Sequence, residues 1–221
     1  MSLDFSPLLH SWRFLLGGLG LTLGLAALTV LCSLMLGGAI GLARCYGPTW
    51  VRVLLVFYID SMRSVPVLVV LVWTYFALPI VTGAVLPPFW AGLIALTAQT
   101  AAYVAEIVRA GIESVRPGQA RAALALGMSR VQAVRQVILP QAIVRMLPAF
   151  GSILSIAIKD TAIASVIAVP EYLDRSQTLA GQSFRPIEVY LTAMVVYFII
   201  LFPVTRTVDI AYVRLAHLGR S

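Results

Sequence analysis

Long apolar stretches alternate with short polar ones along this chain, and the pattern predicts a helical protein that crosses a membrane. A helical span needs about 20 mostly apolar residues, whereas strands are much shorter. Five stretches are long enough, and they cover residues 15–43, 65–86, 89–108, 147–169 and 187–205. We therefore expect an all-α integral membrane protein with five spans, in which residues 1–221 form a single transmembrane domain.

The second of these stretches has an ambiguous start, because an apolar lead-in precedes it. A helix that began at Arg52 would place Arg63 about 16 Å along its axis, where a charge inside a membrane is costly. Pro66 lacks a backbone N–H and restricts the residue before it, which favours a break in the helix. We therefore expect an interfacial helix over residues 53–61 and a turn over residues 63–66.

Composition and charge support a membrane protein and favour one orientation. The chain is 60% hydrophobic and 11% charged, with a mean hydropathy of +0.95, whereas soluble domains carry about 25% charged residues. The net charge of +7 does not indicate a nucleic-acid partner, because no basic patch is interleaved with exposed aromatics. One set of loops holds eleven arginines and the opposite set three. Since Arg and Lys gather in cytoplasmic loops, we expect a periplasmic N-terminus, a cytoplasmic C-terminus and an outer loop, residues 170–188, that is a short surface segment.

A basic, alanine-rich stretch separates the third span from the fourth. Pro117 can begin a helix, the alanines that follow favour it, and Gly127 can close it in a left-handed conformation. Ser129 and Gln132 have the spacing of a capping box that opens a second helix, and we expect Pro140 to end that helix.

Residues 116–140 therefore predict a short, flat-sided helix held against a second one on the cytoplasmic side, where another protein could push on it. An ordinary amphipathic helix resting on anionic lipid is the alternative that periodicity leaves open.

Ionisable residues near or within the spans are candidates for function. Lys159 and Asp160 lie in the fourth span, and Lys159 continues a polar stripe that includes Ser155. Such a stripe fits a wet passage between helices better than it fits lipid. We expect Lys159 or Asp160 to line a path or lock a gate, with a structural ion pair as the alternative. Glu106 is expected to pair with Arg109, one helical turn away.

The first span contains two glycine pairs with the spacing that allows helices to approach closely. These are Gly20 with Gly24, and Gly37 with Gly41. Packing within the chain explains them as well as a dimer contact does.

Several kinds of chemistry are excluded by residues that the sequence lacks. The single lysine, Lys159, does not follow a glycine, so the chain cannot supply a phosphate-binding P-loop of its own. His10 and His217 lie near opposite ends, which leaves no histidine for intramembrane proteolysis or a metal pair. Cys32 and Cys45 fit neither a metal motif nor a disulfide framework.

The alanine-rich stretch resembles the EAA motif of ABC-importer permeases, with its elements at Arg121-Ala122-Ala123, Gly127 and Ile138-Leu139-Pro140. Other segments are similar to the polar amino-acid uptake subfamily of these permeases: YIDSMRSVPVLVVL (58–71), AAYVAEIVRAGIESVRPGQ (101–119), LPQA (139–142) and KDTAIASVI (159–167).

The resemblance implies a type I ABC-importer permease fold, with five helices, an outside N-terminus and a coupling helix that docks into a groove of an ATPase. It implies ATPase contacts for Gly118, Arg121, Ala122, Ala123 and Gly127. Together with the ionisable residues, it leads us to expect the translocation path or gate at Arg63, Pro66, Glu106, Ser155, Lys159 and Asp160.

The implied partners are two ATP-binding cassette subunits, which bind the ATP and magnesium, a periplasmic binding protein and a second permease subunit in a bacterial inner membrane. No cofactor, metal or catalytic residue is expected in this chain. The family's glutamate is replaced here by Arg121, which favours a heterodimer whose other permease carries the better motif. The segments 63–73 and 122–128 are most similar to permeases for acidic amino acids.

Two functions of other classes remain as alternatives. An ATPase-independent channel or secondary transporter would drive uptake from this chain alone and leave the alanine-rich stretch unexplained. A non-transporting membrane scaffold would tolerate neutralisation of Lys159 and Asp160.

Overall fold

The computed structural model describes residues 3–216, and all regular elements within that range are helices. His217 and Arg220 lie outside the described residues. The elements are α1 (Ser6–His10), α2 (Trp12–Tyr46), α3 (Thr49–Ser64), α4 (Val67–Val72), η1 (Trp73–Ala77), α5 (Leu78–Thr82), α6 (Pro88–Glu113), α7 (Pro117–Ala125), α8 (Arg130–Ala133), η2 (Val134–Ile138), α9 (Leu139–Asp160), η3 (Thr161–Ile167), α10 (Tyr172–Ser183) and α11 (Pro186–Ala216).

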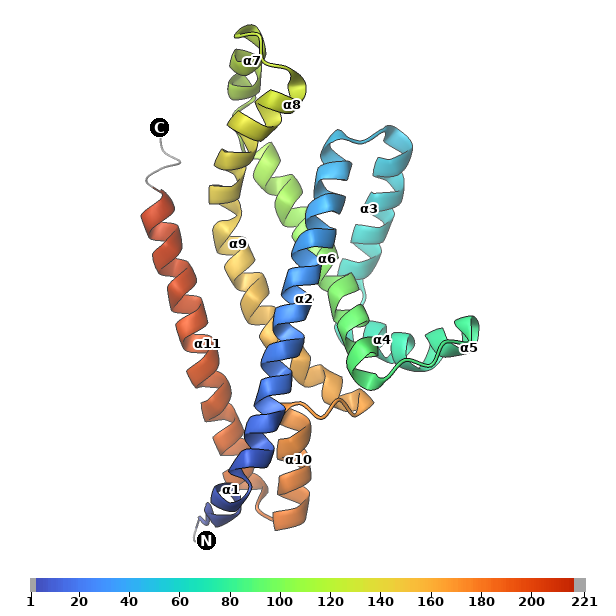
Figure 1. Cartoon of the computed structure of the whole chain (residues 1–221), viewed down its shortest axis with the longest axis vertical. Helices are drawn as coiled ribbons and strands as arrows, with labels where there is room; N and C mark the ends of the chain where they lie inside the picture. Colours follow the sequence, from blue (N-terminus) through green and yellow to red (C-terminus); the bar gives the residue numbers. More distant parts are fainter. Residues whose placement is uncertain (1–2, 217–221) are drawn as a thin grey trace.

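Long helices run roughly along the longest axis of the molecule (Figure 1), with α7 and α8 at one end and α1 and α10 at the other. Within the described residues, four helical stretches are long and apolar enough to cross a membrane, and a bent helix pair would make a fifth span. The stretches 15–43, 89–108 and 187–205 lie inside α2, α6 and α11.

Close contact between α2 and α6 builds the centre of the bundle. A Cβ added at Gly37 would lie 2.5 Å from the Ala101 carbonyl oxygen, and one at Gly41 would lie 2.8 Å from the Ala105 carbonyl oxygen. These two glycines therefore let the helix backbones approach each other. The other glycine pair of α2 is Gly20 with Gly24. A Cβ added at either position would have no atom of the described residues within 4 Å, other than those of its own helix and its chain neighbours.

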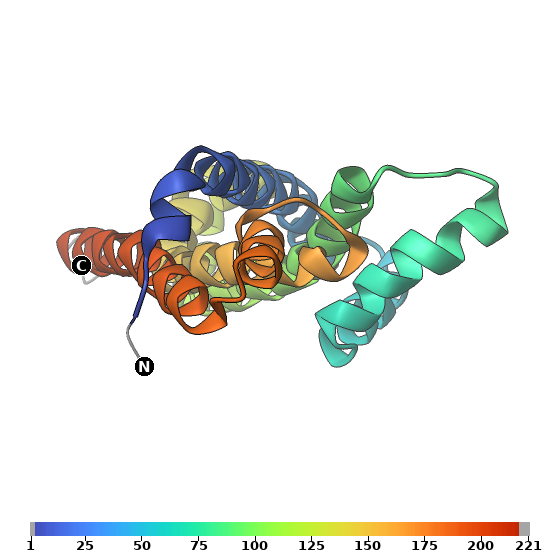
Figure 2. The ribbon, with the colours of Figure 1, turned by 90° about the horizontal axis from the view of Figure 1, so that it is seen from below.

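The second apolar stretch is not one straight helix, and the helix expected over residues 53–61 extends further in both directions. Helix α3 begins earlier, at Thr49, and lies beside α6, where the Tyr58 hydroxyl donates to the Ala98 carbonyl at 2.6 Å. The break at Val65 and Pro66 is confirmed, and the chain bends there by 107° between α3 and the segment α4–η1–α5. That segment extends sideways from the bundle (Figure 2).

Pro140 does not end the helix that precedes it, contrary to expectation. Residues 130–167 form one continuous helical stretch, in which the π-helical turn η2 lies directly before Pro140. A wider turn relieves the clash between a proline ring and the preceding carbonyl, so the helix continues past the proline.

The outer loop is also more ordered than the sequence predicts. Residues 172–183 form helix α10, which packs against α2 and α11. Tyr172, Leu179 and Ala180 are buried on its inner face, and their spacing of seven and eight residues is a helical periodicity.

Candidate functional site

The end of the molecule that carries α7 has the local structure that its sequence predicts. Pro117 lies in the first turn of α7, and Gly127 adopts the left-handed conformation that ends it, with φ +83°. The Ser129 side chain accepts from the Gln132 N–H at 3.3 Å, and the Gln132 side chain accepts from the Ser129 N–H at 2.8 Å. The expected capping box is therefore confirmed, and it satisfies two backbone N–H groups at the start of α8.

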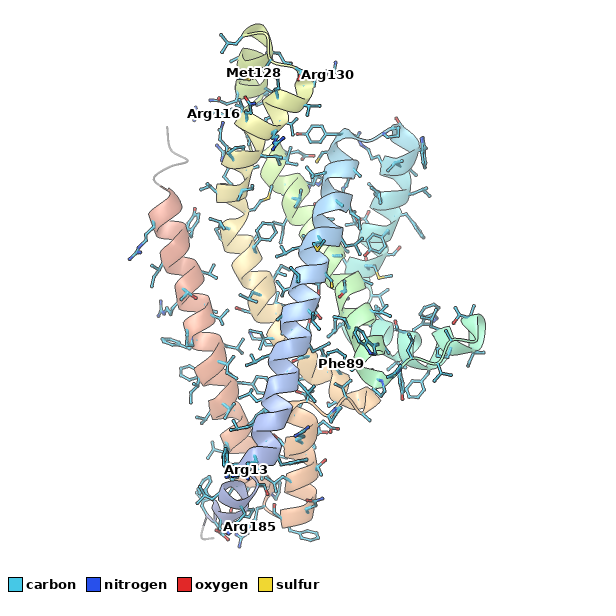
Figure 3. The ribbon with its side chains drawn as sticks, in the orientation of Figure 1. Arg13, Phe89, Arg116, Met128, Arg130 and Arg185 are labelled. Carbon is cyan, nitrogen blue, oxygen red and sulfur yellow. The ribbon has the colours of Figure 1, made fainter. Side chains whose placement is uncertain are left out.

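One face of helix α7 is exposed to solvent, and the other packs against its own chain. Gly118, Arg121 and Ala122 are exposed, whereas Ala123 is only 4% exposed. Figure 3 shows Arg116, Met128 and Arg130 at the same tip of the molecule. The expected contact residues thus divide: Ala123 packs inward, and the others are open to a partner.

A cavity of about 430 Å³ brings together three of the residues that were predicted to line the path. It lies between the α3–α4 break, the middle of α6 and the C-terminal part of α9. Arg63, Pro66 and Asp160 all line it, although they are separated by as many as 97 positions in the chain (63 to 160). The lining residues are Arg63, Ser64, Val65, Pro66, Val67, Gln99, Thr100, Tyr103, Ile153, Ile156 and Asp160.

Side chains of α6 hold the α3–α4 break beside this cavity. Gln99 donates from Nε2 to the carbonyls of Met62, at 3.1 Å, and Val65, at 2.7 Å. The Tyr103 hydroxyl reaches the Arg63 carbonyl at 3.5 Å. These are carbonyls that the end of α3 leaves without a helical partner, so α6 stabilises the bend. The only sign of Gln99 in the sequence is that it is a lone amide in the apolar span 89–108, so its role was not predicted.

Glu106 is the centre of an ion-pair network that reaches Arg63 on the cavity wall. Its carboxylate pairs with Arg109 at 2.5 Å, as expected, but also with Arg44 at 2.5 Å and Arg63 at 3.9 Å. Arg63 also lies over the Tyr103 ring, 5.7 Å from its centroid. The charge of Arg63 is therefore compensated where it stands, which explains why α3 does not stop before it.

Lys159 and Asp160 face different surroundings. Lys159, Ser152 and Ser155 line a separate pocket of about 260 Å³ between α9 and α11, and Lys159 is exposed. Asp160 instead lines the larger cavity with Arg63. The predicted stripe exists, but the structure does not bring Ser155 and Lys159 to the cavity that holds Asp160.

A buried polar cluster at the opposite end was missed by the sequence analysis. Glu171 is fully buried and accepts from the Thr22 hydroxyl at 3.0 Å, the Tyr197 hydroxyl at 3.3 Å and the Asp174 N–H at 2.8 Å. Thr22 in turn accepts from the Tyr172 N–H at 3.0 Å. Burial raises the pKa of the Glu171 carboxyl, against the hydrogen bonds, which lower it.

This cluster clamps α10 between α2 and α11. Arg175 adds to it by donating to the Phe14 carbonyl at 2.6 Å and the Pro170 carbonyl at 3.0 Å. A Cβ at Gly18 would lie 3.0 Å from the Glu171 carbonyl oxygen, so the glycine permits the close approach. Within residues 3–216, this cluster included, no group of three or more His, Cys, Asp or Glu side chains could hold a metal ion.

Comparison with known families gives the class of this architecture. Residues 30–218 match the model of the binding-protein-dependent transport system inner membrane component. The chain belongs to this permease family. The permease is 34% identical over 201 residues to the glutamine transport system permease protein GlnP of Escherichia coli K12, covering 90% of this chain and 92% of the relative. It is 36% identical over 214 residues to the octopine transport system permease protein OccM of Rhizobium radiobacter, covering 93% and 87%.

Solved structures agree with the family. A chain of an amino acid ABC transporter crystallised with histidines superposes on this permease with a TM-score of 0.90 and 33% identity, covering 97% of this chain and all of the other. A chain of the MetNI methionine ABC transporter superposes with a TM-score of 0.80 at 19% identity, which shows the shared fold alone. The permease therefore has the type I ABC-importer fold that its motifs predict.

Proposed function

We propose that this permease is the transmembrane subunit of an ATP-driven importer that moves a polar amino acid across the membrane by alternating access. The observation that carries the proposal is the exposed helix α7, closed by a left-handed glycine and joined to a chain that superposes on an amino acid ABC transporter with a TM-score of 0.90. Relatives named for glutamine, octopine and L-cystine support an amino-acid cargo. None of these three names specifies an acidic amino acid, so that cargo remains a prediction.

The continuous helix that follows α7 provides a mechanical path for coupling. Residues 130–167 run without a break from the α7 tip to the region of Asp160. At 1.5 Å per residue this stretch is about 57 Å long. An ATPase that displaces Gly118, Arg121 and Ala122 would therefore move α9 and the cavity wall that it forms.

The cavity beside the α3–α4 break is the proposed translocation path. Arg63 and Asp160 place opposite charges on its walls, as needed for the carboxylate and ammonium groups of an amino acid. Glu106 holds Arg44 and, on the cavity wall, Arg63 and acts as part of the gate. Lys159 and Ser155 border α11, and we assign them to the moving contact between α9 and α11.

The proposed assembly is supported by membership of the family. The chain would have five spans in a bacterial inner membrane, with a periplasmic N-terminus. Two separate ATP-binding cassette subunits would bind ATP and magnesium, and a periplasmic binding protein would deliver the amino acid. Arg121, where the motif has a glutamate, favours a second, different permease subunit as the partner.

Reconstitution in vesicles tests this function. With binding protein outside and ATP inside, the transporter should take up a polar amino acid only when the ATPase is present. Asp160→Asn should reduce uptake by about tenfold, as expected for the loss of one charged hydrogen-bonding group, and Lys159→Met should reduce it less. Asp60→Asn is the matched control, because Asp60 is an exposed carboxylate of α3 that does not line the cavity.

Uptake without an ATPase would instead support a channel or secondary transporter. Normal uptake in both the Asp160 and Lys159 variants would leave these residues with a structural role alone.

A further inference from the structure

A second basic pocket, of about 330 Å³, lies at the turn between α2 and α3 and is not part of the proposed path. The last turn of α2, the first turns of α3 and the inner end of α6 form its walls. Its lining residues are Arg44, Cys45, Tyr46, Arg52, Val56, Arg109, Ile112 and Glu113.

The arginines around this pocket are unequally satisfied. Arg109 pairs with both Glu106 and Glu113, and Arg44 pairs with Glu106. Arg52 has no carboxylate within 4.0 Å among the residues that the structure describes. Its Nε donates to the Arg44 carbonyl at 3.3 Å, which ties the side chain to the pocket wall and leaves its terminal NH₂ groups for another acceptor.

Charge in this region also exceeds what the protein itself neutralises. The linked group contains four guanidinium groups, of Arg44, Arg52, Arg63 and Arg109, and two carboxylates, of Glu106 and Glu113, so two positive charges remain. Helix α3, which is 16 residues long, also begins at this turn, and its N-terminus adds positive potential. The pocket therefore suits an anion.

The surface around the pocket has the features of a membrane interface. Tyr46 is 50% exposed and Trp50 is 68% exposed at the same turn, and such aromatics lie at the headgroup level of membranes. One to two turns further along α3, Leu54 and Phe57 are exposed apolar side chains. A headgroup in the pocket would thus have apolar surface beneath it for an acyl chain.

We propose that this pocket binds the phosphate of an anionic membrane lipid, with Arg52 as the principal phosphate ligand. Guanidinium groups bind phosphate through paired N–H donors, and basic pockets between membrane helices bind anionic headgroups. The bound phosphate draws together the ends of α2 and α3. It thereby steadies Arg44, whose partner Glu106 also holds Arg63 beside the path. The proposal requires a membrane-embedded chain and does not depend on its cargo or ATPase.

Native mass spectrometry of the purified transporter tests the site with phosphatidylglycerol and phosphatidylcholine as probes. The wild type should retain phosphatidylglycerol more strongly than phosphatidylcholine. Arg52→Gln should lower phosphatidylglycerol retention about tenfold, and Arg52→Lys should fall between the two, because it keeps the charge and loses the paired donors. Arg206→Gln is the matched control, since Arg206 is an exposed arginine of α11 outside the pocket.

Two results with the variants would overturn the proposal, and a third, with free phosphate, would do so as well. One is undiminished phosphatidylglycerol retention in Arg52→Gln, with a thermal unfolding curve showing that the variant is folded. The other is an equal loss in Arg206→Gln, which would mean that retention depends only on total charge. Excess inorganic phosphate should displace little bound lipid; complete displacement would assign the pocket to free phosphate and contradict the lipid assignment. None of these measurements requires ATP or transport, so they stand apart from the test of the importer.

Discussion

Two threonines of α2 show how much a single hydroxyl depends on its surroundings. Thr22 and Thr29 are both fully buried. Thr22 donates to Glu171 and accepts from the Tyr172 N–H, whereas the Thr29 hydroxyl has no hydrogen-bond partner among the described residues. A buried polar atom stabilises a fold only when it is paired.

Replacing these two residues by valine should therefore change the stability of the fold to different extents. Thr22→Val leaves the Tyr172 N–H unpaired and removes a donor from Glu171, so it should lower the free energy of unfolding by about 1–3 kcal/mol. Thr29→Val should be neutral or stabilising, because it removes a buried hydroxyl that has no hydrogen-bond partner among the described residues. Thermal unfolding of the purified transporter measures both. Equal destabilisation by the two variants would argue against the clamp between α2 and α10.

At the scale of elements, the bend between α3 and α4 depends on a side chain from a different helix. Val65 and Pro66 interrupt the helix, and Gln99 of α6 binds the exposed carbonyls on the α3 side. A proline alone permits a break, but the direction of the bend follows from these contacts.

Gln99→Leu should weaken this bend. It leaves the Met62 and Val65 carbonyls without their side-chain donor, and the expected loss of unfolding free energy is about 1–3 kcal/mol. Thr97→Val is the control on the same helix, since its buried hydroxyl has no hydrogen-bond partner in the described part of the chain. Amide hydrogen exchange should quicken over residues 62–70 in Gln99→Leu alone. Unchanged exchange there would show that the proline suffices to hold the bend.

Helix α7 allows shape and folding effects to be separated. Ala122 is exposed, so Ala122→Trp should leave the chain folded and block the docking of an ATPase, which would abolish coupled uptake. Ala123 is 4% exposed, so Ala123→Trp should first disturb α7 itself, at about 1–3 kcal/mol for an overpacked site. Gly127→Val should cost about 1 kcal/mol or more, because φ is +83° there. Arg121→Ala should reduce coupled uptake less than Ala122→Trp does.

Co-purification of the ATPase, together with ATP hydrolysis stimulated by the binding protein, distinguishes these variants. Wild-type coupling in Ala122→Trp would mean that this face of α7 is not the docking surface, and that α7 rests on lipid instead.

The arginines of the two sets of loops lie at opposite ends of the long axis of the molecule. Arg116 and Arg130 lie at the end that carries α7, whereas Arg13 and Arg185 lie at the opposite end (Figure 3). The loops counted as opposite in the sequence thus lie at opposite ends of the fold. The excess of arginine at the α7 end predicts that this end faces the cytoplasm.

Cysteine labelling in intact cells measures that orientation. In a background without Cys32 and Cys45, a cysteine at Ser129 should react with an impermeant reagent only after the membrane is opened. A cysteine at Gln182, in the exposed part of α10, should react from outside and serves as the control. Labelling at Ser129 in intact cells would reverse the proposed topology.

The sequence by itself determined the local features whose physics is local. Apolar length predicted the long helices, Pro66 the break after α3, Ser129 and Gln132 the capping box, and Gly127 the left-handed turn. The motif around Arg121 indicated the permease family, which the matched residues 30–218 confirm.

Only the tertiary structure decided which distant residues meet. Glu106 pairs with three arginines, and this compensation lets α3 extend through Arg63, where the cost of a lone charge predicted a turn. Asp160 joins Arg63 at one cavity while its neighbour Lys159 faces another, since adjacent helical residues point about 100° apart. The partners of a buried charge lie on other helices, so its energy is set by packing that no short stretch of sequence contains.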